Sequence, residues 1–82
     1  MAMDRLALLV SKNCFLCTNA KEAMTRVAER ADITWTEIDV ADHPEYAREY
    51  GDRLPVVLLD GKEHGYWHVE EERLFKDLGD NG

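Results

Sequence analysis

The sequence predicts a single α/β domain in which helices cover both faces of a mixed four-stranded sheet. Three observations support this fold class. A short continuous apolar run at 6–10 is typical of a strand buried on both faces. A helical pattern follows that run directly, and a strong hairpin signal, Asp60-Gly61, separates two later segments. With 82 residues, the chain is expected to form one domain over 1–82, with 79–82 as a frayed tail.

The first half of the chain predicts two parallel strands joined by a helix. The first strand spans 6–10, and the helix spans roughly 15–31, because apolar residues recur there at steps of three and four. Residues 33–40 are rich in β-branched and aromatic side chains and predict the second strand. A right-handed crossover makes these strands parallel. The residues that the helix is expected to bury are Cys17, Ala20, Met24, Val27, Ala28 and Ala31.

A second, shorter helix is predicted over 42–50. Asp42 is placed to cap it, Pro44 suits its first turn, and Glu45 lies three residues after the cap, where its side chain can reach back. Gly51 suits the C-terminal cap that ends this helix.

The last part of the chain predicts a hairpin and a closing helix. The third strand spans 54–59, and after the turn the return strand spans 62–67, with an irregularity where Gly65 interrupts it. The closing helix spans 69–78 and carries three glutamates, at 70–72, in its first turn, where negative charge suits the positive end of the helix dipole. The element order is therefore β-α-β-α-β-β-α. The apolar stripe expected on the closing helix is Leu74, Phe75 and Leu78.

Composition and charge argue against a disordered, a nucleic-acid-binding and a membrane-spanning protein. The 45% share of hydrophobic residues is too high for a disordered chain. The net charge is −7, and it is divided between +2 over 1–31 and −9 over 32–82. No basic stripe with interleaved aromatics occurs, so nucleic-acid binding is disfavoured, and no run approaches the ~18–20 apolar residues of a membrane span. Asp4 stands where a signal peptide carries positive charge, which predicts a cytoplasmic protein, and we expect a monomer.

Two cysteines, Cys14 and Cys17, lie where the first strand turns into the first helix. So short a loop constrains the unfolded chain little, which favours chemistry over structural stapling. Free N–H groups and the positive dipole end at a helix N-terminus stabilise a thiolate, and thiols there have pKa values of roughly 3.5–7.5 against about 8.5 when free. We therefore predict that Cys14, at or next to the N-cap, is the nucleophile. Cys17, one turn into the helix, is predicted to be the more buried, resolving thiol.

The main competing interpretation of the two cysteines is half of a zinc site. Zinc needs about four ligands, and no second C-x-x-C pair exists. The three histidines are each expected to be surface residues, and two of them lie across a predicted strand end rather than on one helix face. We expect no bound cofactor. A metal or iron–sulfur site shared between two chains and a non-catalytic binding module stay open as alternatives. The histidines are His43, His64 and His68.

Leu54-Pro55, at the start of the third strand, allows two interpretations. Proline can simply open a strand. Alternatively, a cis-proline faces the cysteines and turns the Leu54 backbone groups outward to pair with an extended disulfide substrate. Phe15 and Leu16 also allow two interpretations. In one, Leu16 packs into the core and Phe15 is a partly buried ring; in the other, both side chains form a hydrophobic rim around Cys14.

These residues carry a resemblance to a glutaredoxin-like protein of the thioredoxin superfamily. The chain is most similar to the small bacterial family with a C-x-L-C centre, and the match runs over almost its whole length. The resemblance implies a thioredoxin-like fold and dithiol–disulfide exchange, with Cys14 as nucleophile, Cys17 as resolving thiol, Pro55 as cis-proline and Lys12 near the thiolate. The matching segments are Cys14-Phe15-Leu16-Cys17, Glu37-Ile38-Asp39-Val40 and Arg53-Leu54-Pro55-Val56.

Departures from that family pattern bear on the partner. The dipeptide between the cysteines is Phe-Leu instead of Pro-Tyr, and the Gly-Gly-x-Asp-Asp type segment that holds glutathione is replaced by Gly-Tyr-Trp-His-Val-Glu at 65–70. Lys12 and Arg53 could offer charged contacts to glutathione, but we expect a protein disulfide as substrate, docked on Phe15, Leu54 and Trp67. The reductant that restores the cysteines is either glutathione or a thioredoxin reductase. Both tryptophans are otherwise expected to be core or edge-strand aromatics.

Overall fold

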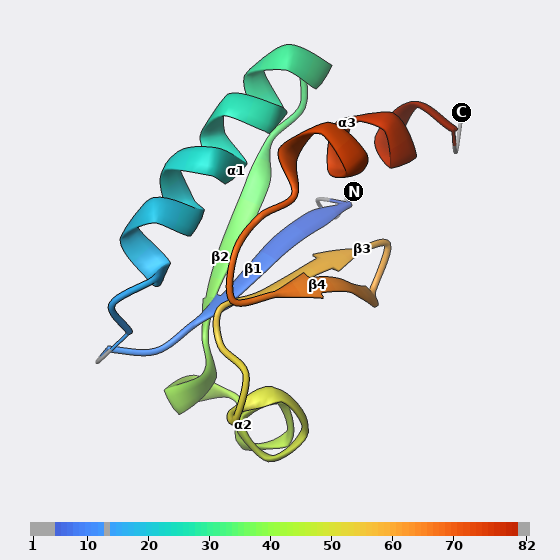
Figure 1. Cartoon of the computed structure of the whole chain (residues 1–82). Helices are drawn as coiled ribbons and strands as arrows, with labels where there is room; N and C mark the ends of the chain where they lie inside the picture. The colour runs from blue at the N-terminus through green and yellow to red at the C-terminus, as the bar shows by residue number, and fades with distance from the viewer. Residues whose placement is uncertain (1–4, 13, 81–82) are drawn as a thin grey trace.

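The computed structural model describes residues 5–12 and 14–80 and confirms the β-α-β-α-β-β-α order (Figure 1). Each strand and helix forms close to where local sequence predicts it, and one short 3-10 helix, η1, is added after the second strand. Among the described residues, none of the helices is long and apolar enough to cross a membrane. The elements are β1 (Leu6–Val10), α1 (Cys17–Ala31), β2 (Trp35–Asp39), η1 (Val40–Asp42), α2 (Pro44–Tyr50), β3 (Val56–Leu59), β4 (Lys62–Tyr66) and α3 (Glu71–Asp80).

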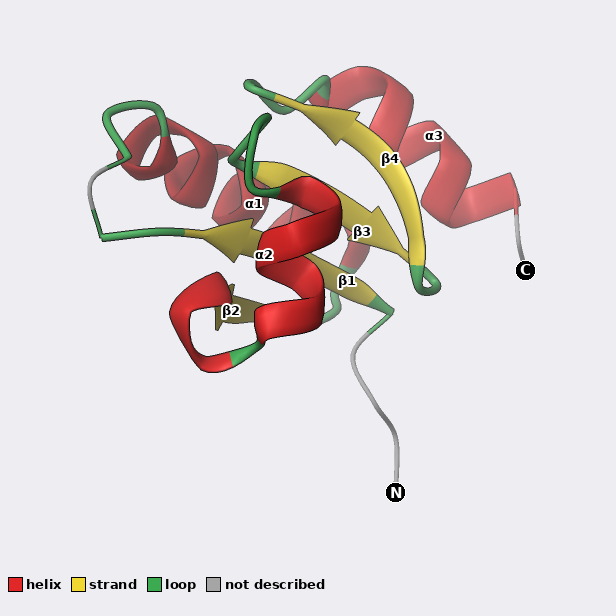
Figure 2. Cartoon of the chain, turned by 90° about the horizontal axis from the view of Figure 1, so that it is seen from below, coloured by secondary structure: helices red, strands yellow, loops and turns green. Residues whose placement is uncertain are grey.

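The four strands form one mixed sheet in the order β2-β1-β3-β4. β1 and β2 are parallel, as the crossover helix requires, whereas β3 is antiparallel to both β1 and β4. Figures 1 and 2 show α1 and α3 side by side on one face of the sheet and α2 on the other. The predicted fold class is therefore confirmed.

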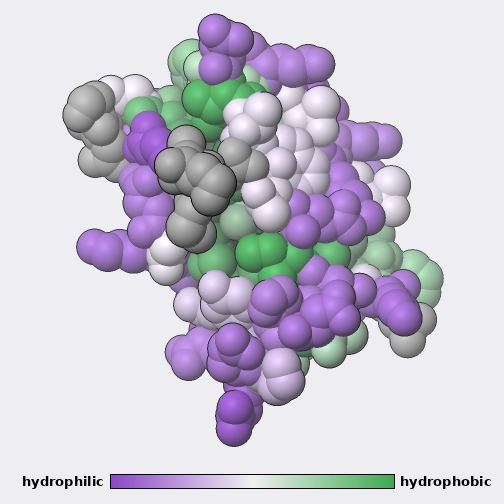
Figure 3. All heavy atoms as spheres, turned by 180° about the vertical axis from the view of Figure 1, so that it is seen from behind, coloured by the Kyte–Doolittle hydropathy of each residue, from purple (hydrophilic) through white to green (hydrophobic). Residues whose placement is uncertain are grey.

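The sheet buries side chains on both faces, because β1 alternates between two apolar clusters. The larger cluster lies under α1 and α3, and the smaller one lies under α2, where Tyr46 and Tyr50 pack against it. Hydrophilic side chains cover much of the face seen in Figure 3, with smaller hydrophobic areas between them. The larger cluster is Leu6, Leu8, Val10, Cys17, Ala20, Met24, Val27, Val57, Leu59, Leu74 and Leu78, and the smaller is Leu9, Val40, Val56 and Leu58.

The predicted cap of the second helix is wrong. Asp42 was expected there because a glutamate follows it three residues later, but Asp42 ends η1 instead. His43 occupies the N-cap position of α2 without a side-chain hydrogen bond. Asp39 is the residue that caps: its carboxylate accepts a hydrogen bond of 2.9 Å from the Ala41 N–H at the start of η1. Asp42 therefore belongs to the 3-10 helix that precedes α2 and does not cap α2.

Gly51 ends α2, as predicted, but for a steric reason. Its φ is −61°, so the left-handed freedom of glycine is not used. A Cβ on Gly51 would collide with the carbonyl oxygen of Ala47, which lies one turn earlier. The close backbone approach therefore requires glycine at this position.

The hairpin between β3 and β4 forms where the sequence predicts it. Asp60 and Gly61 have φ values of 53° and 83°, the two positive values that a type I′ turn needs. The β3–β4 register shifts between Val57 and Leu58, opposite the predicted irregularity at Gly65. The return strand ends at Tyr66, one residue earlier than expected, and the chain then leaves the sheet.

Candidate active site

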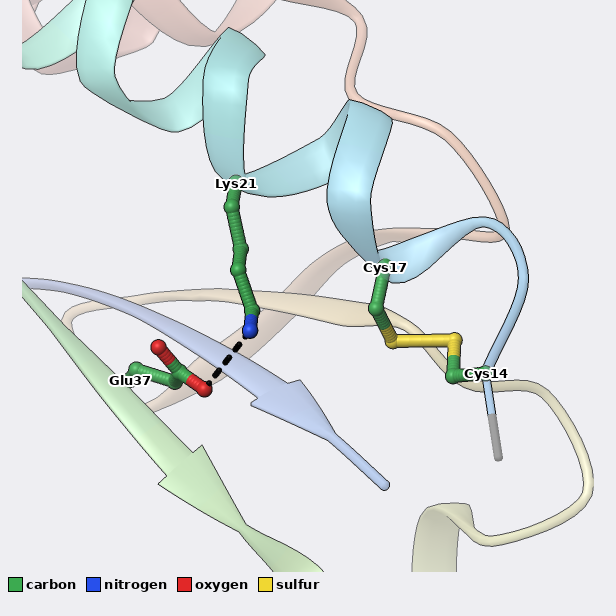
Figure 4. Close-up of a disulfide and its surroundings, with 4 residues drawn as sticks. All are labelled: Cys14, Cys17, Lys21 and Glu37. Atoms are coloured by element: carbon green, nitrogen blue, oxygen red, sulfur yellow. Dashed lines mark ion pairs between the residues drawn. A yellow bond between two sulfur atoms is a disulfide. The ribbon is translucent and has the colours of Figure 1, made fainter. Parts of the chain in front are cut away.

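Cys14 and Cys17 are joined by a disulfide, with their Cα atoms 5.3 Å apart (Figure 4). Cys17 is only 4% exposed and belongs to the larger core cluster. Cys14 is partly buried and packs against the same cluster. The expected difference in burial is confirmed, because Cys17 is the more buried of the two cysteines.

The start of α1 differs from the prediction by two residues. α1 begins at Cys17, with Leu16 as N-cap, so Cys17 is the first helical residue rather than one turn inside. Cys14 lies two residues before the cap, in the preceding turn. Because its sulfur is bonded to Cys17, it still lies at the N-terminal end of the helix, where backbone N–H groups lack intrahelical partners. The first turn of α1 carries no acidic residue to oppose a thiolate.

The Leu54–Pro55 peptide bond is cis, as one of the two interpretations predicted. Strand register places it at the same end of the sheet as the cysteines, because Leu9 near the end of β1 pairs with Val56 at the start of β3. Pro55 is buried, and its carbonyl oxygen accepts a hydrogen bond of 2.8 Å from the Trp67 N–H. Three segments far apart in sequence therefore meet at one end of the sheet.

Large apolar side chains are exposed around this end of the sheet. We call them the apolar rim: Phe15, Leu16, Tyr66 and Trp67. Phe15 is 98% exposed and Leu16 46%, so the interpretation in which Leu16 packs into the core is wrong. Trp67 is 52% exposed with φ at 71°, whereas Trp35 packs against the core cluster as expected. The Tyr66 and Trp67 rings meet edge to face, with centroids 5.0 Å apart.

A pocket of about 200 Å³ adjoins the apolar rim. It lies between the first turns of α1 and the segment that links β4 to α3. Leu16, Ala20 and Ala23 form one side of it, and Trp67 and Val69 form the other. Sequence patterns did not reveal this pocket, because its two sides come from opposite ends of the chain.

The two predicted cationic contacts lie in different surroundings. Lys12 is exposed in the turn after β1. The Arg53 guanidinium donates two hydrogen bonds of 3.2 Å to Glu63 and one of 3.0 Å to Asp52. The hydrogen bonds to Glu63 raise the pKa of Arg53 above its ordinary value. Two carboxylates thus already compensate the positive charge of Arg53.

One ion pair beside the disulfide was not anticipated from the sequence. Lys21 of α1 extends toward the sheet and pairs with Glu37 of β2 at 3.0 Å (Figure 4). In the sequence, Lys21 looks like one of several charged residues on the polar face of an amphipathic helix. Only the parallel packing of β2 beside β1, under α1, brings its partner within reach.

The three histidines lie in separate places. His43 precedes α2, and its ring centroid is 5.6 Å from that of Tyr46. His64 in β4 is hydrogen-bonded to Asp77 of α3 at 2.7 Å, and His68 is exposed. Over residues 5–12 and 14–80, no three His, Cys, Asp or Glu side chains gather into a group that could hold a metal ion.

Comparison with known sequences identifies relatives over nearly the whole chain. The sequence model of a family described as Glutaredoxin-like domain (DUF836) matches residues 5–79. Two uncharacterized proteins, one from Mycobacterium bovis and one from Mycobacterium tuberculosis, are each 39% identical to this chain. Each alignment covers 95% of this chain and 86% of the relative.

Comparison with solved structures identifies the fold. A structural genomics target protein from X. campestris matches with a TM-score of 0.71 and 29% identity, over 92% of this chain and 96% of that one. A mutant thioredoxin from Halobacterium salinarum matches with a TM-score of 0.63 and 25% identity, over 92% and 71%. Thioredoxin 1 from Thermosipho africanus matches with a TM-score of 0.63, over 93% of this chain and 91% of that one. Its sequence is 17% identical, so this likeness shows the fold alone. The thioredoxin-like fold is confirmed.

Proposed function

Because the chain belongs to the glutaredoxin-like domain family, we propose that it is a thiol–disulfide oxidoreductase that reduces disulfides in other proteins. The observation that carries this proposal is the cysteine pair. Cys14 and Cys17 lie within bonding distance in the folded chain, and they differ in exposure as an attacking and a resolving thiol should. The pair closes a loop too short to stabilise the fold appreciably, so a structural role accounts for it poorly.

The proposed reaction transfers two electrons from the cysteine pair to the substrate. The Cys14 thiolate attacks one sulfur of the substrate disulfide, whose S–S bond breaks; the other substrate sulfur leaves as a thiolate and takes up a proton. Cys17 then attacks the Cys14 sulfur of the mixed disulfide and loses its proton. The second substrate sulfur leaves as a thiol, and the Cys14–Cys17 disulfide remains. Two thiols of a reductant, either glutathione or a thioredoxin reductase, restore the dithiol.

We propose that the substrate is a protein with an apolar patch. The apolar rim lies at the same end of the sheet as the cysteine pair, and exposed aromatic side chains of this kind often anchor protein partners. The adjoining pocket offers room for one apolar side chain of the docked segment. The Leu54 backbone, beside Pro55 at the same end of the sheet, is proposed to pair with an extended substrate segment.

Glutathione is proposed to be a poor substrate for this site. It is a small anion, and holding it needs several charge-assisted contacts in fixed positions. Arg53 is engaged by Glu63 and Asp52, and the segment after β4 offers Tyr66 and Trp67 in place of a polar clamp. We propose that the reaction takes place in the cytoplasm, where reductants keep such a dithiol reduced.

Reduction of insulin disulfides tests the proposal. The protein is supplied with electrons in two separate arms, NADPH with thioredoxin reductase and NADPH with glutathione and glutathione reductase. Insulin reduction is expected in the reductase arm, with none for Cys14→Ser. Cys17→Ser should accumulate the mixed disulfide and turn over poorly. If the protein accelerates insulin reduction in neither arm, nor above the uncatalysed rate with dithiothreitol as electron source, the chain is a non-catalytic binding module.

Two further measurements separate the remaining alternatives. Anaerobic purification followed by metal analysis tests for an iron–sulfur or zinc site shared through Cys14, and a stoichiometric metal would contradict the redox proposal. A mixed-disulfide assay with glutathione tests the choice of partner. Turnover at the level of a dithiol glutaredoxin, abolished by Lys12→Ala or Arg53→Ala, would show that a glutathione clamp is present.

A further inference from the structure

Resting on the proposed function, we infer that the Lys21–Glu37 ion pair controls the second step of the reaction, the attack by Cys17. Lys21 favours the Cys17 thiolate, and Glu37 opposes it by compensating the charge of Lys21. Both are positioning residues, since they act through Cys17 and touch neither substrate nor the reacting sulfur of Cys14. The pair sits beside the disulfide in Figure 4.

Helix geometry brings Lys21 close to Cys17. The two residues are four positions apart on α1, so they are neighbours on one side of the helix with Cβ atoms roughly 5–6 Å apart. Helical side chains lean toward the N-terminus, which directs Lys21 back over the turn that carries Cys17. Figure 4 shows Lys21 descending from α1 toward β2, with its ammonium on the Cys17 side of Glu37.

Burial explains why Cys17 needs such a charge. Cys17 is 4% exposed among apolar side chains, and an apolar environment disfavours a thiolate. The attack on the mixed disulfide nevertheless requires the thiolate form. A cation at the edge of the cluster lowers the free energy of that form, while an anion beside the cation offsets part of the effect.

Among the described residues, the other charged groups near this end of α1 are Glu71, Asp39 and Lys12. From β1 and β3, the side chains that face it are apolar. On α3, Glu71 pairs with Arg26 of α1 at 2.8 Å, farther along the helix. Asp39 at the end of β2, level with Val10 of β1, carries a further carboxylate at this end of the sheet and accepts the Ala41 N–H. Its charge is the same in every variant compared below, whereas the Lys21–Glu37 pair is the one that the variants change. Lys12 lies before Cys14 in the preceding turn and is common to every variant in the test.

The attack by Cys17 on the mixed disulfide needs no added oxidant or reductant. The Cys17 thiol loses its proton, and the resulting thiolate attacks the Cys14 sulfur of the mixed disulfide. The Cys14–substrate S–S bond breaks as the Cys14–Cys17 bond forms, and the departing substrate sulfur takes up one proton.

Ellman's reagent separates this step from the first one. Reduced protein mixed with one equivalent of the reagent should release one thionitrobenzoate when Cys14 attacks and a second when Cys17 resolves the mixed disulfide. Lys21→Met is expected to slow the second phase roughly three- to tenfold and to shift its pH profile upward, with the first phase little changed. Lys21→Arg keeps the charge and should restore the rate. Glu37→Gln removes the opposing anion, so the second phase should be equal or faster.

A matched control distinguishes charge from mere bracing of the helix. Arg30→Met breaks another exposed ion pair between α1 and a distant element, nine residues beyond Lys21 and farther from Cys17, and should leave both phases unchanged. If Lys21→Met and Glu37→Gln slow the second phase equally, the pair only braces α1 on the sheet and the inference is wrong. An unchanged second phase in Lys21→Met also overturns it. Wild-type protein that releases no second thionitrobenzoate would instead contradict the proposed function itself.

Discussion

Phe15→Ala separates substrate docking from folding. Phe15 stands between the two cysteines and is 98% exposed, so in the free protein its ring makes almost no contacts that truncation could remove. The free energy of unfolding is therefore expected to change by less than about 0.5 kcal/mol. If the apolar rim docks a protein partner, the same ring becomes covered only in the complex.

The size of the docking effect follows from the area that becomes buried. Covering a Phe side chain fully contributes about 1.5–3 kcal/mol. Since each 1.4 kcal/mol is a factor of ten, Phe15→Ala should lower kcat/KM for a protein disulfide by roughly 10- to 150-fold. A small disulfide such as Ellman's reagent has no patch to place on the rim, and its rate should change little.

The second phenylalanine of the chain provides the matched control. Phe75 in α3 packs against the larger core cluster, and the Arg30 guanidinium lies 4.1 Å from its ring centroid. Phe75→Ala should destabilise the fold by about 2 kcal/mol, around half the cost of truncating a fully buried Phe. In a chain of this length that lowers Tm by roughly 10 °C. Turnover of the remaining folded protein should be normal.

The assay compares kcat/KM for insulin and for Ellman's reagent at a temperature where all variants are folded, alongside thermal melts. Equal loss on both substrates in Phe15→Ala would mean that the ring shapes the cysteine loop and does not dock a partner. A fall in Tm comparable to that of Phe75→Ala would refute the assignment of Phe15 to the surface.

Three more predictions concern the thiols, acid stability and the end of α2. Limiting iodoacetamide at neutral pH should alkylate Cys14 of the reduced protein before Cys17, and preferential labelling of Cys17 by mass spectrometry would reverse their roles. The hydrogen bonds from Arg26 lower the pKa of Glu71 below its ordinary 4.5 in the fold, so the pair stabilises the protein above about that pH and loses its effect as pH falls further. Melts at a series of pH values should therefore show a shallower acid decline for Glu71→Gln, and an unchanged decline would contradict this. Gly51→Ala should lower the free energy of unfolding, measured in urea, by about 1–3 kcal/mol, because the added Cβ meets the backbone carbonyl of Ala47. An unchanged free energy of unfolding would show that the end of α2 shifts to accept the Cβ without cost.

Local sequence determined the order of the elements and most of their bounds. The apolar run of β1, the helical spacing of α1 and the Asp60-Gly61 turn are each fixed by residues that are near neighbours in the chain. The C-x-x-C pair at the end of a predicted strand was enough to indicate the chemistry, because position at a helix N-terminus follows from local structure. The capping pattern at Asp42 did not predict the start of α2 correctly, because Asp42 is the last residue of η1 and His43 stands at the N-cap position.

Tertiary structure decided the surroundings of the cysteines. The start of α1 moved to Cys17, where no capping side chain marks the boundary, and this left Phe15 and Leu16 on the surface. The ion pair of Lys21 with Glu37 joins α1 to β2, the next element along the chain, across a separation of 16 residues in the sequence. Such contacts depend on strand register and on how a helix lies across the sheet. Neither quantity is encoded in any short window of sequence, so the pairing of Lys21 with Glu37 beside the disulfide became visible only once the sheet and its helices were assembled.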